Sequence, residues 1–433
     1  MKTGGGSYAI ERWRGFGFGR TALALVSGCG LLAPATGLAA GSLVTNPDLV
    51  DNRFEDYYLQ PCIDGAATLF GRGWSIEEIN AYNASICSVV YSSGTFNSSD
   101  TYQSTQNIGS IGAQTKSTNV VAKKEVDSIQ ARLDELAVEE DVRKGGWGIL
   151  LSAQKSETER VSTNNEIGYD ADLDGIMAGL DYRFNDSLVA GIAVGLTNDK
   201  ADYAGGSGTL KTESRTLMGY TTYLIGNHGH VDGYLGFAQL DYTTDRDISI
   251  DGEAADAFGF TGNISADFQG DQILAGVSAG YDWYPGNLSY GYFGAIDYSK
   301  TNLDGYSEEG NTGLELKYPD QDPKSLTITL GATASYSIDM GWGAMIPNVT
   351  VSAVHQQESD ARSFNARLLI MPDVDTTSLK LETDDPDRNY LISSLGVTFQ
   401  LNKGGQVFVT YEVLSQHDFL EVSSISAGFL AEF

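Results

Sequence analysis

The sequence predicts an all-β membrane protein: a twelve-stranded antiparallel β-barrel of the outer-membrane type, with an α-helix in its lumen and a short helical segment before it. Three observations lead to this prediction. From Trp147 onward, apolar and polar residues alternate with a period of two, which is typical of strands. Short turns alternate with longer polar stretches along the same region. Ahead of it lies a helix-forming stretch that is too polar to face lipid.

The composition excludes nucleic-acid binding. The chain has 433 residues and a formal net charge of −30, with 27 Lys and Arg against 57 Asp and Glu. A protein with this charge repels phosphate backbones, so no nucleic-acid partner is expected. Hydrophobic residues make up 41% of the chain and aromatic residues 10%, which excludes an acidic disordered tail.

Residues 1–39 are interpreted as a signal peptide that directs the chain to the Sec translocon. A basic start precedes an apolar run, and residues 37–39 supply the small side chains that a signal peptidase requires. An alternative stays open, because residues 26–28 followed by Cys29 resemble a lipobox. Cys29 would then be the lipidated first residue of a lipoprotein. Either reading takes the chain out of the cytoplasm.

Residues 40–92 are expected to form a small helical unit. Ser75 followed by Glu78 is a capping box, which predicts the start of a helix. Removal of the signal peptide leaves Cys62 and Cys87. Two cysteines in an exported protein predict one disulfide bond between them.

A linker and a long helix are expected next. Residues 93–116 are rich in Ser, Thr, Asn, Gln and Gly and have no periodic apolar pattern, so they are interpreted as a linker. Residues 117–144 contain neither Gly nor Pro and are rich in Glu, Lys, Ala and Leu, which predicts a helix. At about 1.5 Å per residue it is long enough to cross a membrane. Its polar surface leaves three alternatives: a surface helix, a short coiled coil or a plug in a polar channel.

Residues 145–433 are expected to form the barrel. On a typical strand, Ile273, Ala275 and Val277 alternate with small or polar residues. Two features place the apolar face outward in lipid: the opposite faces consist mainly of Gly, Ser and Thr, and aromatic residues gather at strand ends as in interfacial girdles. The mature chain has no apolar run of about 18 residues, so strands must do any spanning.

The connections predict the strand count. Five short turns are expected at 185–186, 227–229, 285–287, 340–341 and 403–404. Six longer polar loops are expected at 157–168, 200–210, 244–266, 301–323, 358–387 and 416–420. This alternation makes twelve antiparallel strands with both ends on one side, as in barrels with short periplasmic turns and long outside loops. The acidic stretches 245–256 and 372–387 are interpreted as solvated loops.

A resemblance to a known family rests on three segments. The end of the chain resembles the signal read by the outer-membrane barrel-assembly machinery, with Ser426, Gly428, Ala431 and Phe433 as its residues. Residues 168–195 look like the second and third strands of the autotransporter β-domain. Residues 125–133, followed by Leu136, are similar to the pore helix of that family. The resemblance covers about residues 120–433.

The resemblance implies a type V secretion translocator. Such a protein inserts among outer-membrane lipid and lipopolysaccharide and displays its own N-terminal segment, the passenger, at the cell surface, while the pore helix closes the lumen. The pore-helix residues concerned are Lys123, Lys124, Asp127, Ser128 and Arg132. The expected lumen-facing residues are Asp181, Arg183 and Asp282. Basic residues of the helix, Arg143 included, are expected to meet Asp181 or Asp282.

The same resemblance bears on self-cleavage. Family members that cut themselves use an Asn-Asn pair in the pore helix, whose first side chain attacks its own backbone. Asp127 and Ser128 stand at the corresponding place in this chain. An uncleaved passenger is therefore predicted.

No enzymatic activity and no catalytic residue are expected. None of the four histidines is followed two residues later by Ser, and no H-E-x-x-H motif is present. Asp170, Asp172 and Asp174 are spaced as in a calcium loop but fit the outward face of a strand better. No cofactor is expected beyond a divalent cation bridging these aspartates to lipopolysaccharide, which is a weak hypothesis.

Two other functions stay open at this point. One is a twelve-stranded porin for small solutes with an N-terminal extension. The other is an adhesion protein whose outside loops bind a surface. The sequence does not identify the passenger's partner.

Overall fold

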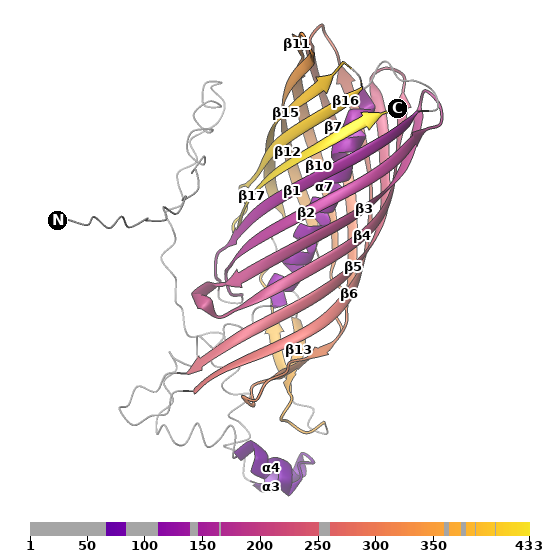
Figure 1. Ribbon diagram of the computed structural model, residues 1–433. Coiled ribbons are helices and arrows are strands. Elements are labelled where there is room, and N and C mark those ends of the chain that lie inside the picture. Colours follow the sequence, from indigo (N-terminus) through magenta and orange to yellow (C-terminus); the bar gives the residue numbers. More distant parts are fainter. Residues whose placement is uncertain are drawn as a thin grey trace, which may run out of the picture. The chain divides into compact units, whose positions relative to one another are not determined.

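The computed structural model describes residues 66–83, 111–138, 146–163, 166–250, 260–358, 363–373, 378–385, 387–402 and 404–433 (Figure 1). The expected signal peptide, Cys62, Cys87 and most of the expected linker lie outside these residues.

Twelve antiparallel strands form a closed wall, as predicted. They are β1 (Trp147–Arg160), β2 (Tyr169–Arg183), β3 (Leu188–Tyr203), β4 (Gly208–Ile225), β5 (Gly229–Ile250), β6 (Phe260–Trp283), β7 (Leu288–Leu303), β10 (Lys324–Tyr336), β12 (Gly343–Glu358), β15 (Asn389–Leu401), β16 (Gly405–Ser415) and β17 (Leu420–Glu432). The short β11 (Ile338–Met340) follows β10 and pairs with β12. Pairing of β17 with β1, from Glu432 opposite Gly148 onward, closes the wall. A closed wall leaves no unpaired strand edge, so it is stable in lipid.

The strands on one side of the barrel are longer than the sequence indicated. The stretch 244–266 was predicted to be a loop, yet β5 runs to Ile250 and β6 starts at Phe260. The residues here still alternate, with Thr244 and Arg246 buried and their neighbours more exposed. The outward residues here are polar because water replaces lipid outside the wall, so an apolar outer face no longer marks the strand.

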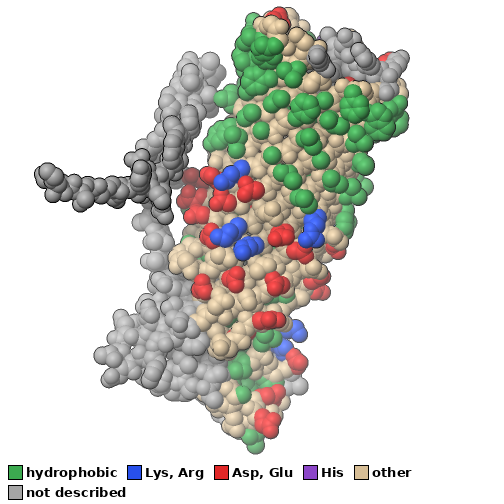
Figure 2. All heavy atoms as spheres, in the orientation of Figure 1, with side chains coloured by type: hydrophobic (Ala, Val, Ile, Leu, Met, Phe, Trp, Pro, Cys, Tyr) green, Lys and Arg blue, Asp and Glu red, His purple; other side chains and the backbone are tan. Residues whose placement is uncertain are grey.

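The outer face changes character along the barrel. Near the short turns it is apolar: on β3, Ile192, Val194 and Leu196 are 61%, 57% and 52% exposed. Beyond Leu196 the next outward residue with a charge is Lys200, and Figure 2 shows apolar side chains toward one end of the wall with charged ones beyond. Aromatic rings pack at the turn end, for example Trp147 and Tyr182 with centroids 5.0 Å apart. This is the layout of a wall in lipid with an interfacial girdle.

A second, smaller sheet forms from two of the longer loops. It consists of β8 (Tyr306–Ser307), β9 (Leu316–Tyr318), β13 (Ser363–Leu368) and β14 (Leu379–Glu382). The first two strands lie between β7 and β10, and the last two between β12 and β15. The expectation of plain polar loops at 301–323 and 358–387 is therefore corrected.

The first helices in the described part of the chain are two short ones, α3 (Ala66–Gly71) and α4 (Ile76–Tyr82). The predicted capping box is present: Ser75 Oγ accepts a hydrogen bond from the Glu78 backbone N–H, and Glu78 Oε2 accepts one from Ser75 N–H. A 3₁₀ turn, η4 (Ala204–Gly206), links β3 to β4. Among the described residues, no helix is long and apolar enough to cross a membrane.

The long helix α7 (Ile111–Val138) lies inside the barrel (Figure 1). It begins six residues before the helix expected from residue 117. Its contacts with the wall are mainly with β2, β3 and β4, and fewer are with β1, β5 and β7.

Candidate functional site: the helix in the lumen

An apolar stripe fixes α7 against the wall. Ile129 and Leu133, one turn apart on the helix, are fully buried. They belong to a cluster with inward residues of the wall: Leu150, Met177, Ala193, Met218 and Leu430. These apolar contacts with the wall help to set both the rotation and the depth of the helix.

Arg132 joins two strands that flank β1. Its guanidinium makes two hydrogen bonds to Asp181 on β2, with Nε 2.9 Å from Oδ2 and Nη2 2.8 Å from Oδ1. Nη2 also lies 3.2 Å from Oε1 of Glu432 on β17. The Arg132 side chain is fully buried. Such two-point pairing with a carboxylate is the geometry that arginine provides and lysine does not.

Asp181 has a third donor in Tyr220. The Tyr220 hydroxyl on β4 donates to Asp181 Oδ2 at 2.8 Å. Room for the ring comes from Gly191 on β3, where an added Cβ would come within 2.6 Å of Tyr220 Cζ. Arg183 lies 3.6 Å from Glu432 through its Nη2, so Glu432 is shared between two arginines.

A second polar layer lies farther along the helix. Lys124 Nζ is 2.9 Å from Glu412 Oε1 on β16 and donates to Ser424 Oγ on β17 at 2.9 Å. Lys123 Nζ is 2.8 Å from both carboxylate oxygens of Asp127 and 3.4 Å from Glu412. Two lysines and two carboxylates thus neutralise one another inside the barrel.

Glu125 anchors the opposite side of α7. Its Oε1 accepts hydrogen bonds from Ser214 Oγ on β4 at 2.8 Å and from Thr197 Oγ1 on β3 at 3.4 Å. Glu125 is 1% exposed, and its Oε2 has no hydrogen-bond partner within the part of the chain that the structure describes. Hydroxyl groups therefore hold this carboxyl, without the cation that Asp127 has.

Asp127 and Ser128, the pair expected from the resemblance to stand at the family's cleavage position, lie inside the continuous helix. The Asp127 carboxylate is occupied by its contacts with Lys123 and Lys124. Ser128 Oγ donates to the Lys124 carbonyl one turn earlier, at 3.3 Å.

Of the two aspartates expected as partners of the helix, Asp181 contacts it and Asp282 contacts a histidine of the wall instead. Asp181, Arg183 and Asp282 are all buried and inward, but only Asp181 binds an arginine of α7. Asp282 lies beside His230, with 3.7 Å between Oδ2 and Nε2. Asp282 belongs to β6, whereas most contacts of α7 with the wall are with β2, β3 and β4. Arg143 is outside the described residues.

The three aspartates of the weak cation hypothesis point outward. Asp170, Asp172 and Asp174 are exposed on β2, and Lys155 Nζ lies 3.4 Å from Asp172 Oδ1. Within the described ranges, no group of three or more His, Cys, Asp or Glu side chains is placed to hold a metal ion. The cation stays a prediction.

The residues of the expected assembly signal lie on β17 and just after it. Ala431 and Phe433 are on its outward face, and Phe433 is 73% exposed. Ser426 and Gly428 are on the inward face, where Gly428 makes room for a ring: an added Cβ would come within 2.4 Å of Phe408. Recognition by the assembly machinery stays a prediction.

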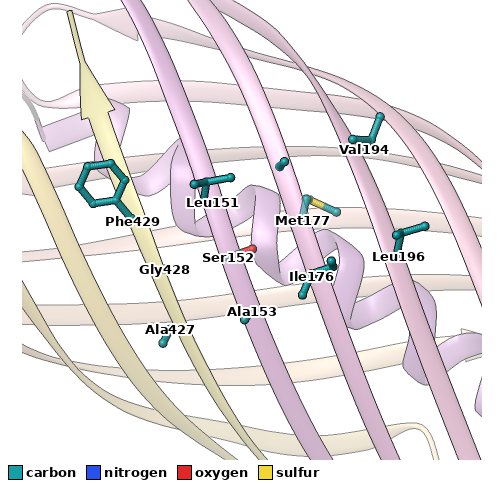
Figure 3. Close-up of a pocket in the computed structure, with 11 residues that line it drawn as sticks. Leu151, Ser152, Ala153, Ile176, Met177, Val194, Leu196, Ala427, Gly428 and Phe429 are labelled. Carbon is teal, nitrogen blue, oxygen red and sulfur yellow. The ribbon is translucent and has the colours of Figure 1, made fainter.

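The outer wall has an apolar recess of about 570 Å³ across the seam of β17 and β1. Figure 3 shows Leu151, Ile176 and Phe429 at this recess, with the helix behind the strands. Its lining is almost entirely apolar, and it belongs to the lipid-facing surface rather than to the lumen.

Several site residues were missed at the sequence level. They are Glu125, Tyr220, Glu412, Ser424 and Glu432. Glu412 and Glu432 carried a signal, because each is a carboxylate on the inward side of an alternating strand. The partner of each could not be predicted, because it depends on how the barrel closes and how deep the helix lies in it. Alternation alone gives neither.

Comparison with known proteins agrees with this architecture. The model of the autotransporter β-domain family matches residues 149–412. The uncharacterized protein YaiT of Escherichia coli (strain K12) is 26% identical over 211 residues, which cover 47% of this chain and 20% of that protein. The protein YaiT of Salmonella typhimurium is 26% identical over 206 residues, with the same coverage. This chain thus spans about one fifth of the length of the curated relatives it matches.

Two solved structures are similar to this chain. The translocator domain of autotransporter NalP from Neisseria meningitidis has a TM-score of 0.54 and 14% identity, covering 73% of this chain and 98% of that one. The β-domain of the Bordetella autotransporter BrkA has a TM-score of 0.49 and 19% identity, covering 67% and 100%. The family model covers more than half of the chain, and the wall has a lipid-facing belt. The chain belongs to the autotransporter β-domain family and is a protein of the Gram-negative outer membrane.

Proposed function

We propose that this outer-membrane autotransporter displays its own N-terminal segment at the cell surface and keeps it attached. The observation that carries the proposal is the direction of α7. Arg132 contacts Glu432, which pairs with Gly148 at the start of β1. Lys124 contacts Ser424, which pairs with Ser156, eight residues farther along β1 toward the longer loops. The helix therefore points its N-terminal end toward the loops.

The longer loops mark the outside in barrels of this kind. A chain that leaves the N-terminal end of α7 therefore continues outward. Export by the Sec translocon and insertion by the barrel-assembly machinery are the steps expected of the family before this state is reached. No catalytic step belongs to the proposal.

Retention of the passenger is supported by the contacts at the cleavage position. Self-cutting members need a side-chain amide free to attack its own backbone carbonyl. In this chain a carboxylate stands there, and two lysine ammonium groups hold it away from that reaction. The helix also continues without a break through Asp127 and Ser128.

Surface display is tested with an epitope tag inserted at Ser98, which lies outside the described residues. In intact cells, an antibody should bind the tag and external protease should remove it. A matched tag in the short turn after Phe184 should stay inaccessible until the outer membrane is opened. If the Ser98 tag is as inaccessible in intact cells as the turn tag, the proposal of surface display is wrong.

Retention is tested by the size of the chain in purified outer membranes. The wild type should remain a single species that carries both an N-terminal tag and the barrel. The double variant Asp127→Asn, Ser128→Asn restores the family's pair and should release the tag. Ser128→Ala is the control and should release nothing. Spontaneous loss of the tag from the wild type would overturn retention.

A second candidate function is a channel for small solutes. Its support is the uneven burial of inward hydroxyls: Thr197 and Thr212, on the helix side, are buried. Thr329 and Thr350, on β10 and β12, are partly exposed. High single-channel conductance of the intact protein, together with a periplasmic Ser98 tag, would favour the channel.

A further inference from the structure

The outer mouth, meaning the end of the lumen at the longer loops, contains an apolar core. Inward residues of β2 to β6 contribute one part of it: Tyr169, Tyr203, Leu210, Tyr242, Ile264 and Phe268. The two loops of the small sheet contribute the other: Tyr306, Leu316, Tyr318, Leu368, Met371 and Leu379. These loops start from β7, β10, β12 and β15. The core therefore reaches from one part of the wall to loops that begin on another.

A buried ion pair holds the first loop in place. Arg246, inward on β5, binds Glu308 in a fork, with Nε 3.2 Å from Oε1 and Nη2 2.5 Å from Oε2. Nη2 also donates to the Leu314 carbonyl at 3.0 Å, and Glu308 Oε2 accepts from the Leu316 N–H at 2.8 Å. Both charged side chains are 5% exposed. One contact thus ties the wall to both arms of the loop.

Stacked rings extend this contact. Tyr242 on β5 stacks on Phe268 on β6 at 4.7 Å, and Phe268 stacks on Tyr306 of the loop at 4.1 Å. Tyr306 in turn lies 4.6 Å from Tyr318 on β9. The loop is packed to the wall by side chains as well as by charge.

A second buried arginine holds the second loop. Arg160, at the end of β1, contacts Glu166 and lies 2.6 Å from Asp384 Oδ2 through its Nη2. Thr163 Oγ1 also donates to Asp384 at 2.7 Å. The two loops join each other where Leu316 on β9 pairs with Leu368 on β13.

We propose that residues 304–323, 363–373 and 378–385 form a lid that closes the outer mouth independently of α7 and assembles after the N-terminal segment has passed. The timing rests on the proposed function, because a chain in transit needs the space that the core occupies. The closure itself does not depend on the proposed function. The barrel then has two closures in series, so loss of the helix alone leaves the mouth shut.

The Glu308 contact is tested by cysteine protection in intact cells. In a chain with its native cysteines replaced by serine, Thr244→Cys introduces a thiol under the lid, at a position that is 6% exposed. An impermeant maleimide should label it slowly. Adding Glu308→Gln should raise the labelling rate about tenfold or more, because the buried Arg246 loses its charged partner. The control Glu309→Gln changes an exposed neighbour and should leave the rate unchanged.

A gel shift on heating shows whether each variant is folded, and only folded protein is scored. Equal labelling with Glu308→Gln and Glu309→Gln would overturn the lid. Because a misfolded Glu308 variant would give no answer, Asp384→Asn supplies the same comparison at the second loop and should also raise labelling.

Bilayer conductance tests the closure in series. Deleting residues 111–138 should leave conductance low, and adding Glu308→Gln to the deletion should raise it severalfold. Full conductance with the deletion alone would overturn the lid. That result would leave the proposed function standing, since surface display is read from the Ser98 tag.

Discussion

The side chain of Arg132 on the lumenal helix passes directly over Gly148 of β1, on the inner face of the wall. A Cβ added at Gly148 would come within 2.2 Å of Arg132 Nη2 and 2.2 Å of Asp181 Oδ1. The glycine thus allows one side chain to reach β2 and β17 across the strand between them. Since β17 and β1 form the closing pair of the barrel, helix placement and wall closure depend on the same few atoms.

Gly148→Ala should disturb this crossing. The new methyl group meets both partners of an ion pair that cannot separate without leaving a charge unpaired. Overpacking of this kind costs about 1–3 kcal/mol. The temperature of the heat-induced gel shift should fall. Gly219→Ala is the matched control, because its Cβ would meet nothing nearer than 3.9 Å. Equal stability of the two variants would contradict the crossing.

Arg132→Ala should destabilise the barrel more strongly. It leaves Asp181 without its charged partner in a buried site, and breaking one side of a buried pair costs about 3–5 kcal/mol. Urea unfolding in detergent measures the loss. Arg215→Ala, at a side chain 60% exposed on the outer face, should change stability by less than about 1 kcal/mol.

A further variant separates charge from packing at this site. Arg132→Ala combined with Asp181→Ala should recover part of the loss from the single change, because no unpaired carboxylate remains at Asp181. A double variant as unstable as the sum of both single changes would show that the two residues do not interact.

Glu125→Ala should loosen the helix on its other side. The change leaves the Ser214 and Thr197 hydroxyls without their buried acceptor, at a cost of about 1–3 kcal/mol. Glu125→Gln keeps an acceptor oxygen and should cost less. Protease sensitivity of α7 in the purified barrel distinguishes these outcomes. Equal sensitivity of the two variants would mean that the hydrogen bonds do not hold the helix.

The alternation of apolar and polar residues along the strands predicted most of the fold. Strands such as β2 show it clearly, because Ile176 and Leu180 face lipid while Met177 and Asp181 face the lumen. The wall lies between two different environments, so each strand shows its orientation in the sequence. The same reasoning failed where water lies outside the wall, which is why the ends of β5 and β6 were predicted to be a loop.

The lid could not be predicted for a different reason. Leu316 and Leu368 lie in stretches that were predicted to be polar loops, and their strands are only three and six residues long. Their pairing joins segments about fifty residues apart. Asp384 was interpreted as part of a solvated loop, but it binds a buried arginine. Only tertiary contacts reveal such partners, because strands this short carry too little alternation to identify what they pair with.

The lid also predicts a response to high pH through Tyr318. Burial and the neighbouring Glu308 carboxylate raise the pKa of Tyr318 well above its usual value. A free tyrosine has a pKa of about 10. The folded state therefore holds the phenolic proton more tightly than the unfolded state does. The resulting stabilisation is complete below pH of about 10 and is lost as pH rises through the folded value.

Difference titration measures this directly. The tyrosinate absorbance of the wild type minus that of Tyr318→Phe should stay near zero until the pH is well above 10. Tyr298→Phe, which changes a partly exposed ring on the outer wall, is the comparison variant. Ionisation of Tyr318 near pH 10 would mean that water reaches β9. The loop core would then be open in solution, and the ring stack on Phe268 would not seal the mouth.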